Sequence, residues 1–237
     1  MKTNANALII AVAVIVAAYL FSNAFQNRNQ SADTISVTGL GKKDFVSDLI
    51  VWSGSFSKKS MILKDAYAAL DSDREKIKSY LLSKGIQSNE VVFSAVNFNK
   101  DFDYIYNENG STKQQIFTGF NLTQTVTVQS KDVNKIEDIS RQSSELINSG
   151  VEFYSNAPEY YYTKLAELKI KMIAEATKDA RVRAQSIAEN AGAGLGNLKK
   201  SDMGVFQITG QNSSEDFSYG GSFNPMSKNK TANITVK

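Results

Sequence analysis

The side chains that could do chemistry are carboxylates, lysines and tyrosines, because the 237-residue chain contains neither histidine nor cysteine. Their absence excludes Ser-His-Asp and Cys-His catalysis, thiol redox chemistry, disulfides, and zinc sites built on histidine or cysteine. A hydrolase would need two carboxylates facing one cleft. The acidic residues are spread along the chain, mostly beside a lysine or arginine. We therefore expect no enzyme and assign no catalytic residue, with a carboxylate-dependent hydrolase as the weakest alternative.

Two glycine patterns could suggest phosphate-binding loops. Gly39–Gly41 lacks a third glycine at the required position, where Asp44 stands, and no helix is expected to follow. Gly192–Gly196 follows an expected helix, at the negative end of its dipole. We interpret the first pattern as a turn between strands and the second as a helix C-cap with a loop, and we expect no cofactor.

An acidic stretch over residues 101–110 could suggest a calcium loop. When Gly110 is aligned with the invariant glycine of an EF-hand, Ile105 and Ile116 occupy positions that require carboxylates. We therefore expect no metal site and interpret this stretch as a solvated hairpin tip.

Clusters of tyrosine are the strongest candidates for a functional surface. Tyr160, Tyr161 and Tyr162 are consecutive, and Tyr104 and Tyr106 lie close to Asn109-Gly110, which is a strong hairpin signal. Aromatic residues are enriched at protein interfaces. These five tyrosines form our candidate interface, and packing on the protein's own core stays open as the alternative.

The N-terminus carries an uncharged apolar segment from Ala7 to Phe21. As a helix, these 15 residues are about 23 Å long at about 1.5 Å per residue. Extension to Phe25 gives 19 residues, which is just enough for a bilayer core of about 30 Å. Residues 1–24 are thus either a cleaved signal peptide or an anchor in the inner membrane, attached through residues 7–25. Both alternatives predict export to the periplasm or cell envelope, with residues 25–33 as a linker.

The net charge argues against a nucleic-acid partner. The chain has 27 Lys and Arg against 24 Asp and Glu, a formal excess of +3. A dedicated nucleic-acid binder usually shows a larger and more concentrated positive charge. We therefore expect no nucleic acid among the partners.

Hydrophobic periodicity and turn signals predict an α+β fold over residues 34–237. Expected strands cover residues 35–38, 45–57, 89–106, 114–129, 151–155, 201–209 and 232–236. Expected helices cover 60–84, closed by Gly85, then 132–148, opened by Asp132, and 158–191. The apolar stripe expected on the first helix comprises Leu63, Tyr67, Leu70, Ile77 and Leu81. The order β-β-α-β-β-α-β-α-β-β favours antiparallel sheets with long helices packed on one face, within a single domain.

With these elements placed, the chain resembles the SIMPL-domain family of bacterial envelope proteins from about residue 35 to 236. The resemblance rests on the order and spacing of several segments, namely Ile35–Gly41 with Asp48, Leu82–Ile86, Val91–Phe98, Tyr104–Gly110, Gly119-Phe120, Thr125–Val128, Ala176–Ala184, Ala191-Gly192 and Leu195-Gly196. Two features depart from it: Ser47-Asp48 stands where members often have Pro-Asp, and the loop over residues 210–229 is particular to this chain.

The resemblance implies an exported α+β domain in the periplasm or cell envelope. It also implies large homo-oligomers in some members, a loose link to envelope or oxidative stress, and no established catalytic residues. We therefore expect a non-enzymatic envelope protein that self-assembles or scaffolds. The alternative is a monomeric module that binds a small ligand or an envelope polymer, with Tyr160–Tyr162 lining the cleft; the ligand itself is not indicated.

Overall fold

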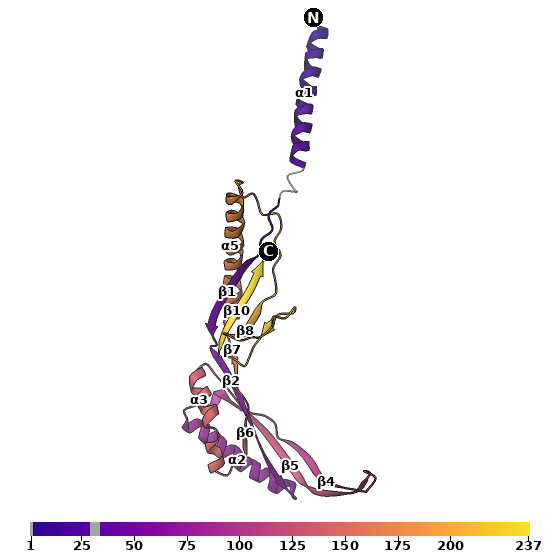
Figure 1. Ribbon diagram of the computed structural model, residues 1–237. Coiled ribbons are helices and arrows are strands. Elements are labelled where there is room, and N and C mark those ends of the chain that lie inside the picture. Colours follow the sequence, from indigo (N-terminus) through magenta and orange to yellow (C-terminus); the bar gives the residue numbers. More distant parts are fainter. Residues whose placement is uncertain (1, 29–33) are drawn as a thin grey trace. The chain divides into compact units, whose positions relative to one another are not determined.

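The fold is described by a computed structural model that covers residues 2–28 and 34–237, with side chains described for residues 9–25 and 34–237. The chain is α+β, as predicted, and divides into two compact units (Figure 1). The larger unit comprises residues 42–172 and 205–233, and the smaller comprises residues 1–41, 173–204 and 234–237. The prediction of a single domain over 34–237 stays a prediction.

The larger unit contains a six-stranded antiparallel sheet with strand order β3-β5-β2-β6, in which β4 also pairs with β5 and β7 with β2. Its strands are β2 (Leu49–Ser60), β3 (Val91–Phe93), β4 (Asn97–Tyr106), β5 (Thr112–Ser130), β6 (Phe153–Ser155) and β7 (Glu159–Tyr161). Its helices are α2 (Leu63–Ser83), η1 (Ser88–Glu90), α3 (Val133–Gln142) and α4 (Glu145–Asn148). The expected strand over 89–106 and the expected helix over 132–148 are therefore each divided.

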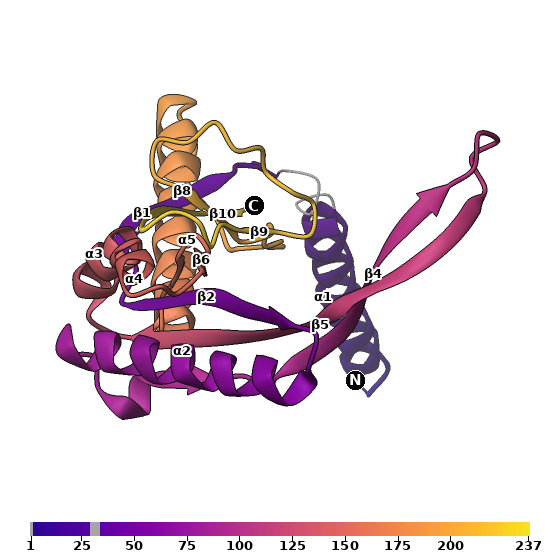
Figure 2. The same cartoon turned by 90° about the horizontal axis from the view of Figure 1, so that it is seen from below.

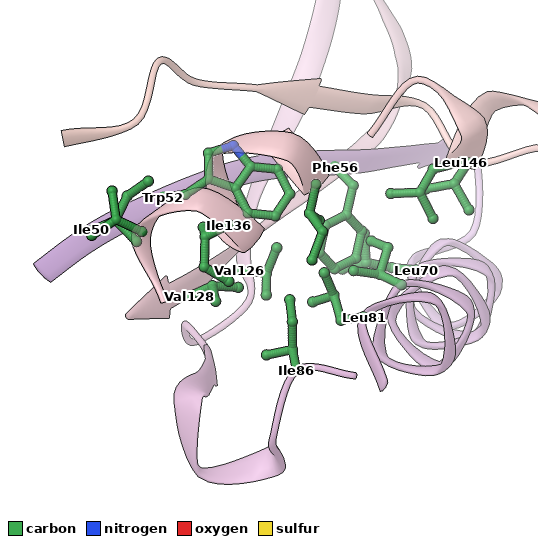
Figure 3. Close-up of a cluster of buried hydrophobic side chains, with 14 of the residues drawn as sticks. Ile50, Trp52, Phe56, Leu70, Leu81, Ile86, Val126, Val128, Ile136 and Leu146 are labelled. Carbon is green, nitrogen blue, oxygen red and sulfur yellow. The ribbon is translucent and has the colours of Figure 1, made fainter. Parts of the chain in front are cut away.

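One face of this sheet forms the hydrophobic core. Along β2 and β5 every second residue is buried, which is the pattern of a sheet with one covered face. α2 and α3 cover that face (Figure 3). The largest fully buried side chains from the two strands are Ile50, Trp52, Phe56, Leu122 and Val126. Each contributes about 1.5–3 kcal/mol through the burial of apolar surface.

The expected stripe on α2 is only partly correct. Leu70, Ile77 and Leu81 are buried, but Leu63 and Tyr67 are exposed. The buried face instead includes Ala66 and Asp73, so it is rotated from the expected one towards these residues. The helix α2 ends at the predicted position: Gly85 has φ 76°, and Ile86 N donates a hydrogen bond to Leu81 O at 3.1 Å.

Asp73 is buried in the helix face that packs on the sheet. Its carboxylate lies 3.0 Å from Lys58 Nζ on β2 and 3.4 Å from Lys76 Nζ one turn along α2. Two cations thus compensate a charge that would otherwise be costly to remove from water.

The interpretation of Gly39–Gly41 as a turn is wrong, since these residues lie inside β1 (Gly39–Val46). The expected strand over 35–38 is not formed. The reason lies in α5 (Leu165–Asn190), because a Cβ on Gly39 would lie 2.1 Å from Ala176 O. A glycine is needed there so that the helix backbone can approach the strand.

The long helix begins later than predicted. Residues 159–161 form β7 against β2, and α5 starts only at Leu165. Asp48 fixes the segment between them, because its carboxylate accepts hydrogen bonds from Thr163 N and Thr163 Oγ1, both at 2.7 Å. On α5, Leu168, Met172, Ala176 and Ala184 are buried, whereas Ile187 is exposed.

A second sheet has the strand order β1-β10-β8-β9. Its remaining strands are β8 (Gln207–Gly210), β9 (Ser222–Phe223) and β10 (Asn229–Val236). β8 and β9 pair in parallel, which departs from the antiparallel expectation. The predicted loop between β8 and β10 is largely irregular, with the short β9 inside it.

The N-terminal apolar segment lies within α1 (Lys2–Arg28), and its described side chains, from Ile9 to Phe25, are all exposed. In the part of the structure searched for membrane spans, no helix has the length and hydrophobicity needed to cross a bilayer. Most of the predicted linker, residues 29–33, lies outside the described residues.

Candidate interaction surface

A two-stranded arm extends the sheet beyond the end of β2. The last residue of β2, Ser60, pairs with Phe120, whereas β4 and β5 continue as a hairpin through residues 101–119 (Figure 2). We call residues 101–119 the arm. We call β2, residues 120–130 of β5, α2 and α3 the body.

The arm closes at the predicted hairpin turn. Asn107 N donates to Ser111 O at 2.8 Å, and Asn109 Oδ1 accepts from Ser111 N at 3.1 Å. Gly110 has φ 78°, a conformation that glycine adopts without strain. These contacts are local, which explains why the sequence pattern located the turn.

Aromatic rings line one face of the arm. Phe102 and Phe117 are cross-strand partners with ring centroids 5.6 Å apart, and Tyr104 stacks on Tyr106 at 6.5 Å. Phe117 also lies 5.1 Å from Phe120, which packs against the body's core. The hydrophobic core thus continues outward as a row of rings, which we call the aromatic face.

This aromatic face becomes less covered towards the tip. Phe102 and Phe117 are half-buried, but Tyr104 and Tyr106 are 50% and 61% exposed. Within the larger unit, the helices that contact β5, α2 and α3, also contact β2, which ends opposite Phe120 before the arm begins (Figure 2). The tyrosines of the arm are therefore on an uncovered surface.

The other three candidate tyrosines occupy β7 and the residue after it. Tyr160 is buried, Tyr161 stacks on Phe223 at 5.9 Å, and Tyr162 contacts Phe45 at 4.8 Å. Tyr160 N also donates to Pro225 O at 2.7 Å. Packing within the larger unit thus accounts for most of this cluster, which is the alternative that the sequence left open.

The two tyrosine groups do not form one site. Tyr104 pairs with Gln115 of β5, whereas Tyr160 pairs with Ile50, which in turn pairs with Ser130. Fifteen residues separate Gln115 from Ser130, which corresponds to about 50 Å at about 3.3 Å per residue.

A polar network lies beside Tyr160. Lys228 Nζ donates to Glu137 Oε2 at 2.8 Å and to Asn134 Oδ1 at 2.5 Å, and Arg141 Nη2 lies 2.5 Å from Glu137 Oε1. The hydrogen bond from Lys228 lowers the pKa of Glu137, whereas burial and the Glu137 carboxylate raise the pKa of Tyr160. Glu137 is thus held ionised between two cations, and it ties residue 228 to α3.

Lys230 is a buried cation that no sequence pattern indicated. Its side chain is fully buried, and its amine donates to Asn224 O and lies 5.4 Å from the Phe223 ring. Burial lowers the pKa of Lys230 to about 8, and Glu215 opposes this shift. The residues that cover the amine come from the segment between β8 and β10, which no local pattern could connect to it.

Two shallow hollows lie elsewhere on the described surface. One of about 660 Å³ lies between α2 and α4, with Glu75, Lys76, Tyr80 and Glu145 in its lining, and one of about 520 Å³ lies at the arm's tip beside Tyr106. Tyr160–Tyr162 line neither of them. Among the residues searched, no three His, Cys, Asp or Glu side chains are grouped so that they could hold a metal ion.

Comparison with known proteins identifies the family. A search of the curated proteins finds no match to the chain. The sequence model of the SIMPL family, described as a protein of unknown function (DUF541), matches residues 35–236, which is most of the chain and includes both the arm and the body. The chain therefore belongs to the SIMPL family.

Proposed function

We propose that this SIMPL-family protein is an exported, non-enzymatic protein of the cell envelope that self-assembles through its arm. The observation that carries the proposal is the aromatic face, which continues the core outward from Phe120 and ends on the exposed Tyr104 and Tyr106. A scaffold in the envelope is the role that we propose for such an assembly.

The energetics of the arm support a protein partner. A two-stranded ribbon on its own is at most marginally stable in water. Exposed tyrosines and phenylalanines supply large, stiff contact surfaces, and they are enriched where proteins associate. A second copy is the simplest partner, because most soluble oligomers are symmetric assemblies of one chain.

The polar groups of the larger unit support a role without catalysis. The Glu137 carboxylate is bonded to Lys228 and Arg141, and the Lys230 amine is enclosed by Asn224 and Phe223. A catalytic acid, base or nucleophile needs a free coordination position next to a substrate. These groups instead bond to the protein itself.

The N-terminus supports export. Its apolar helix leaves every described side chain from Ile9 to Phe25 exposed, which is costly for a segment that stays in water. A targeting segment that directs the chain out of the cytoplasm explains this composition.

The test is the mass of the full chain, purified in mild detergent and measured by light scattering behind a sizing column. We expect the wild-type protein to form a discrete oligomer. The double variant Tyr104→Ala/Tyr106→Ala should shift the protein to a lower mass, because it removes the exposed half of the aromatic face.

The matched control is Tyr67→Ala/Tyr154→Ala, which removes two exposed tyrosines outside the arm. It should leave the mass unchanged. A monomeric wild-type chain, or an arm variant that assembles like the wild type, would contradict the proposal.

A further inference from the structure

The arm has an open edge as well as an aromatic face. In the body, β5 has β2 on one side and β4 or β3 on the other. Beyond Phe120, the structure places no strand of the described chain on the β2 side, so residues 112–119 have a partner only on the β4 side. Every second residue of this segment directs its N–H and C=O groups towards that open side.

The open edge contains a regular, uncharged segment. The pairing with β4 shifts register at Thr118 and again at Lys113, so that both residues are extra residues on β5. Between them, Gln114–Phe117 pairs residue by residue with β4 and carries no charge and no proline. Natural proteins usually protect an exposed edge with charges, prolines or bulges. This protection is missing from the four residues of Gln114–Phe117.

The other edge of the arm is better protected. β4 carries Lys100, Asp101 and Asp103, and Lys59 Nζ bonds to Asp101 Oδ2 at 3.0 Å. A neighbouring strand on that side would meet three charges within four residues. The β5 edge is therefore the side of the arm on which a further strand fits.

We propose that Gln114–Phe117 pairs antiparallel with the same segment of a second copy, so that two arms form a four-stranded sheet in the order β4-β5-β5-β4. This inference rests on the proposed self-assembly and specifies its contact. The uncharged segment lets two copies meet without like-charge repulsion.

Symmetry restricts this pairing to a few registers. The two-fold axis of two identical antiparallel strands is perpendicular to the sheet, so the same residue of each copy lies on the same face. Because successive side chains alternate between faces, one residue must lie opposite itself. Within the segment, this residue is Gln115 or Ile116. Both aromatic faces then lie on one side of the joined sheet, where further copies could pack.

The chain contains no cysteine, so a single introduced cysteine reports on one position. Each variant of the full chain is reduced and then mildly oxidised in detergent, and the yield of disulfide-linked dimer is measured. The test variants are Gln114→Cys, Gln115→Cys, Ile116→Cys and Phe117→Cys. The controls are Asn99→Cys and Asp103→Cys on β4. We expect one strong disulfide-linked dimer, at Gln115→Cys or Ile116→Cys, at a yield at least five-fold above that of the others.

A second variant blocks the edge without a cross-link. Ile116→Lys places a charge in the segment, and Ile105→Lys places one on β4 as the matched control; the two isoleucines are 41% and 43% exposed. Ile116→Lys should remove the dimer contact, as seen by a lower mass in light scattering, and Ile105→Lys should retain it.

The outcomes separate the edge contact from self-assembly itself. If the wild type assembles but the cross-links are uniformly weak, or strongest on β4, edge pairing is wrong and the self-assembly proposal stands. A dimer that survives Ile116→Lys leads to the same conclusion. If the wild-type chain is a monomer, both proposals fail. Cross-linking to a foreign protein in place of a second copy would also overturn this inference.

Discussion

The two halves of β5 lie in opposite environments although they belong to one continuous strand. From Phe120 to Ser130, every second side chain is buried under α2 and α3, and the alternate side chains are mostly half-exposed. From Thr112 to Ile116, every side chain is exposed. The apolar residues Ile116 and Phe117 of the arm therefore contribute little to the core that Leu122 and Val126 build.

The boundary between these halves is set by the neighbouring strand. β2 ends at Ser60, opposite Phe120, and β5 carries an extra residue at Thr118 followed by Gly119 with φ 134°. A bulge bends its strand and increases its twist. A Cβ on Gly119 would lie 2.9 Å from Ser60 O, so this glycine lets β5 pass the end of β2. The arm thus leaves the body at a defined position.

The comparison separates residues that fold the protein from residues available for association. In the body, apolar side chains are covered by helices of the same chain. In the arm, the same kinds of side chain are uncovered, so their free energy of burial is available to a partner. This view predicts different effects from similar substitutions in the two halves.

The largest difference should come from shortening an aliphatic side chain in each half. Leu122→Ala in the body should reduce the free energy of unfolding by about 2–5 kcal/mol, because it leaves a cavity. Ile116→Ala in the arm should change it by less than about 0.5 kcal/mol. The chain has a single tryptophan, Trp52, which is fully buried in the body, so its fluorescence during urea denaturation reports on this unit.

The two variants control for each other, since both remove a branched aliphatic side chain from β5. An Ile116→Ala variant as unstable as Leu122→Ala would show that arm and body unfold as one, and the distinction between them would be wrong.

The features that sequence analysis located correctly are local ones. Gly85 ends α2, Asp132 caps α3 by accepting a hydrogen bond from Lys135 N at 3.2 Å, and Asn109-Gly110 forms the tip of the arm. Each depends on a few neighbouring residues whose conformational preferences are strong. The same local signals were enough to predict the α+β class.

The predictions that were wrong concern residues whose conformation depends on contacts with distant segments of the chain. Gly39 lies in a strand that packs closely on α5, and the residue it approaches, Ala176, is more than 130 residues away along the chain. Tyr160 belongs to β7 because β2 offers a free edge at Ile50. The arm itself was expected as a long hairpin, but its aromatic face could be recognised only once the end of β2 was known. No sequence pattern predicted the burial of Lys230, since this burial depends on residues 215–224.

The second largest expected effect is a dependence of the free energy of unfolding on pH, which is caused by Lys230. Its pKa is about 8 in the folded protein and near the ordinary 10.5 when unfolded. Between these values the unfolded chain binds the additional proton, so stability rises with pH. The full difference corresponds to at most about 3 kcal/mol. We expect urea midpoints to increase from pH 8 towards pH 9.5 and to be flat for this group below pH 7.

The variant Lys230→Met should remove most of this rise. A variant with residues 102–117 replaced by Asn-Gly should keep it, because the groups around the amine, Glu215 and Asn224, lie outside the arm. Measurements stay below pH 10, since burial raises the pKa of Tyr80 and Tyr160 and their titration makes stability fall at higher pH. If the variant without the arm no longer became more stable with rising pH, the arm would be coupled to the region around Lys230.

A third comparison uses an ion pair from each region. Asp73→Asn in the body removes a buried charge that compensates Lys58 and Lys76, and should cost about 1–3 kcal/mol. Asp101→Asn at the base of the arm breaks a more exposed pair with Lys59 and should cost less than about 1 kcal/mol. Denaturation at low and at 1 M salt checks both values, since only the exposed pair should be screened strongly. Equal costs would contradict the assignment of stability to the body.

The smallest expected effect comes from a pair of glycine substitutions at two closely matched positions. Gly110 at the tip of the arm and Gly150 after α4 have φ of 78° and 76°, and a Cβ on either would meet no atom within 4 Å. Alanine therefore introduces a similar backbone strain of about 1 kcal/mol at both positions. Gly150→Ala should lower the unfolding free energy reported by Trp52 by about that amount, whereas Gly110→Ala should leave it unchanged within about 0.3 kcal/mol. Because the local strain is the same, any difference measures how strongly each position is coupled to the body, and equal losses would mean that the arm's tip is folded together with it.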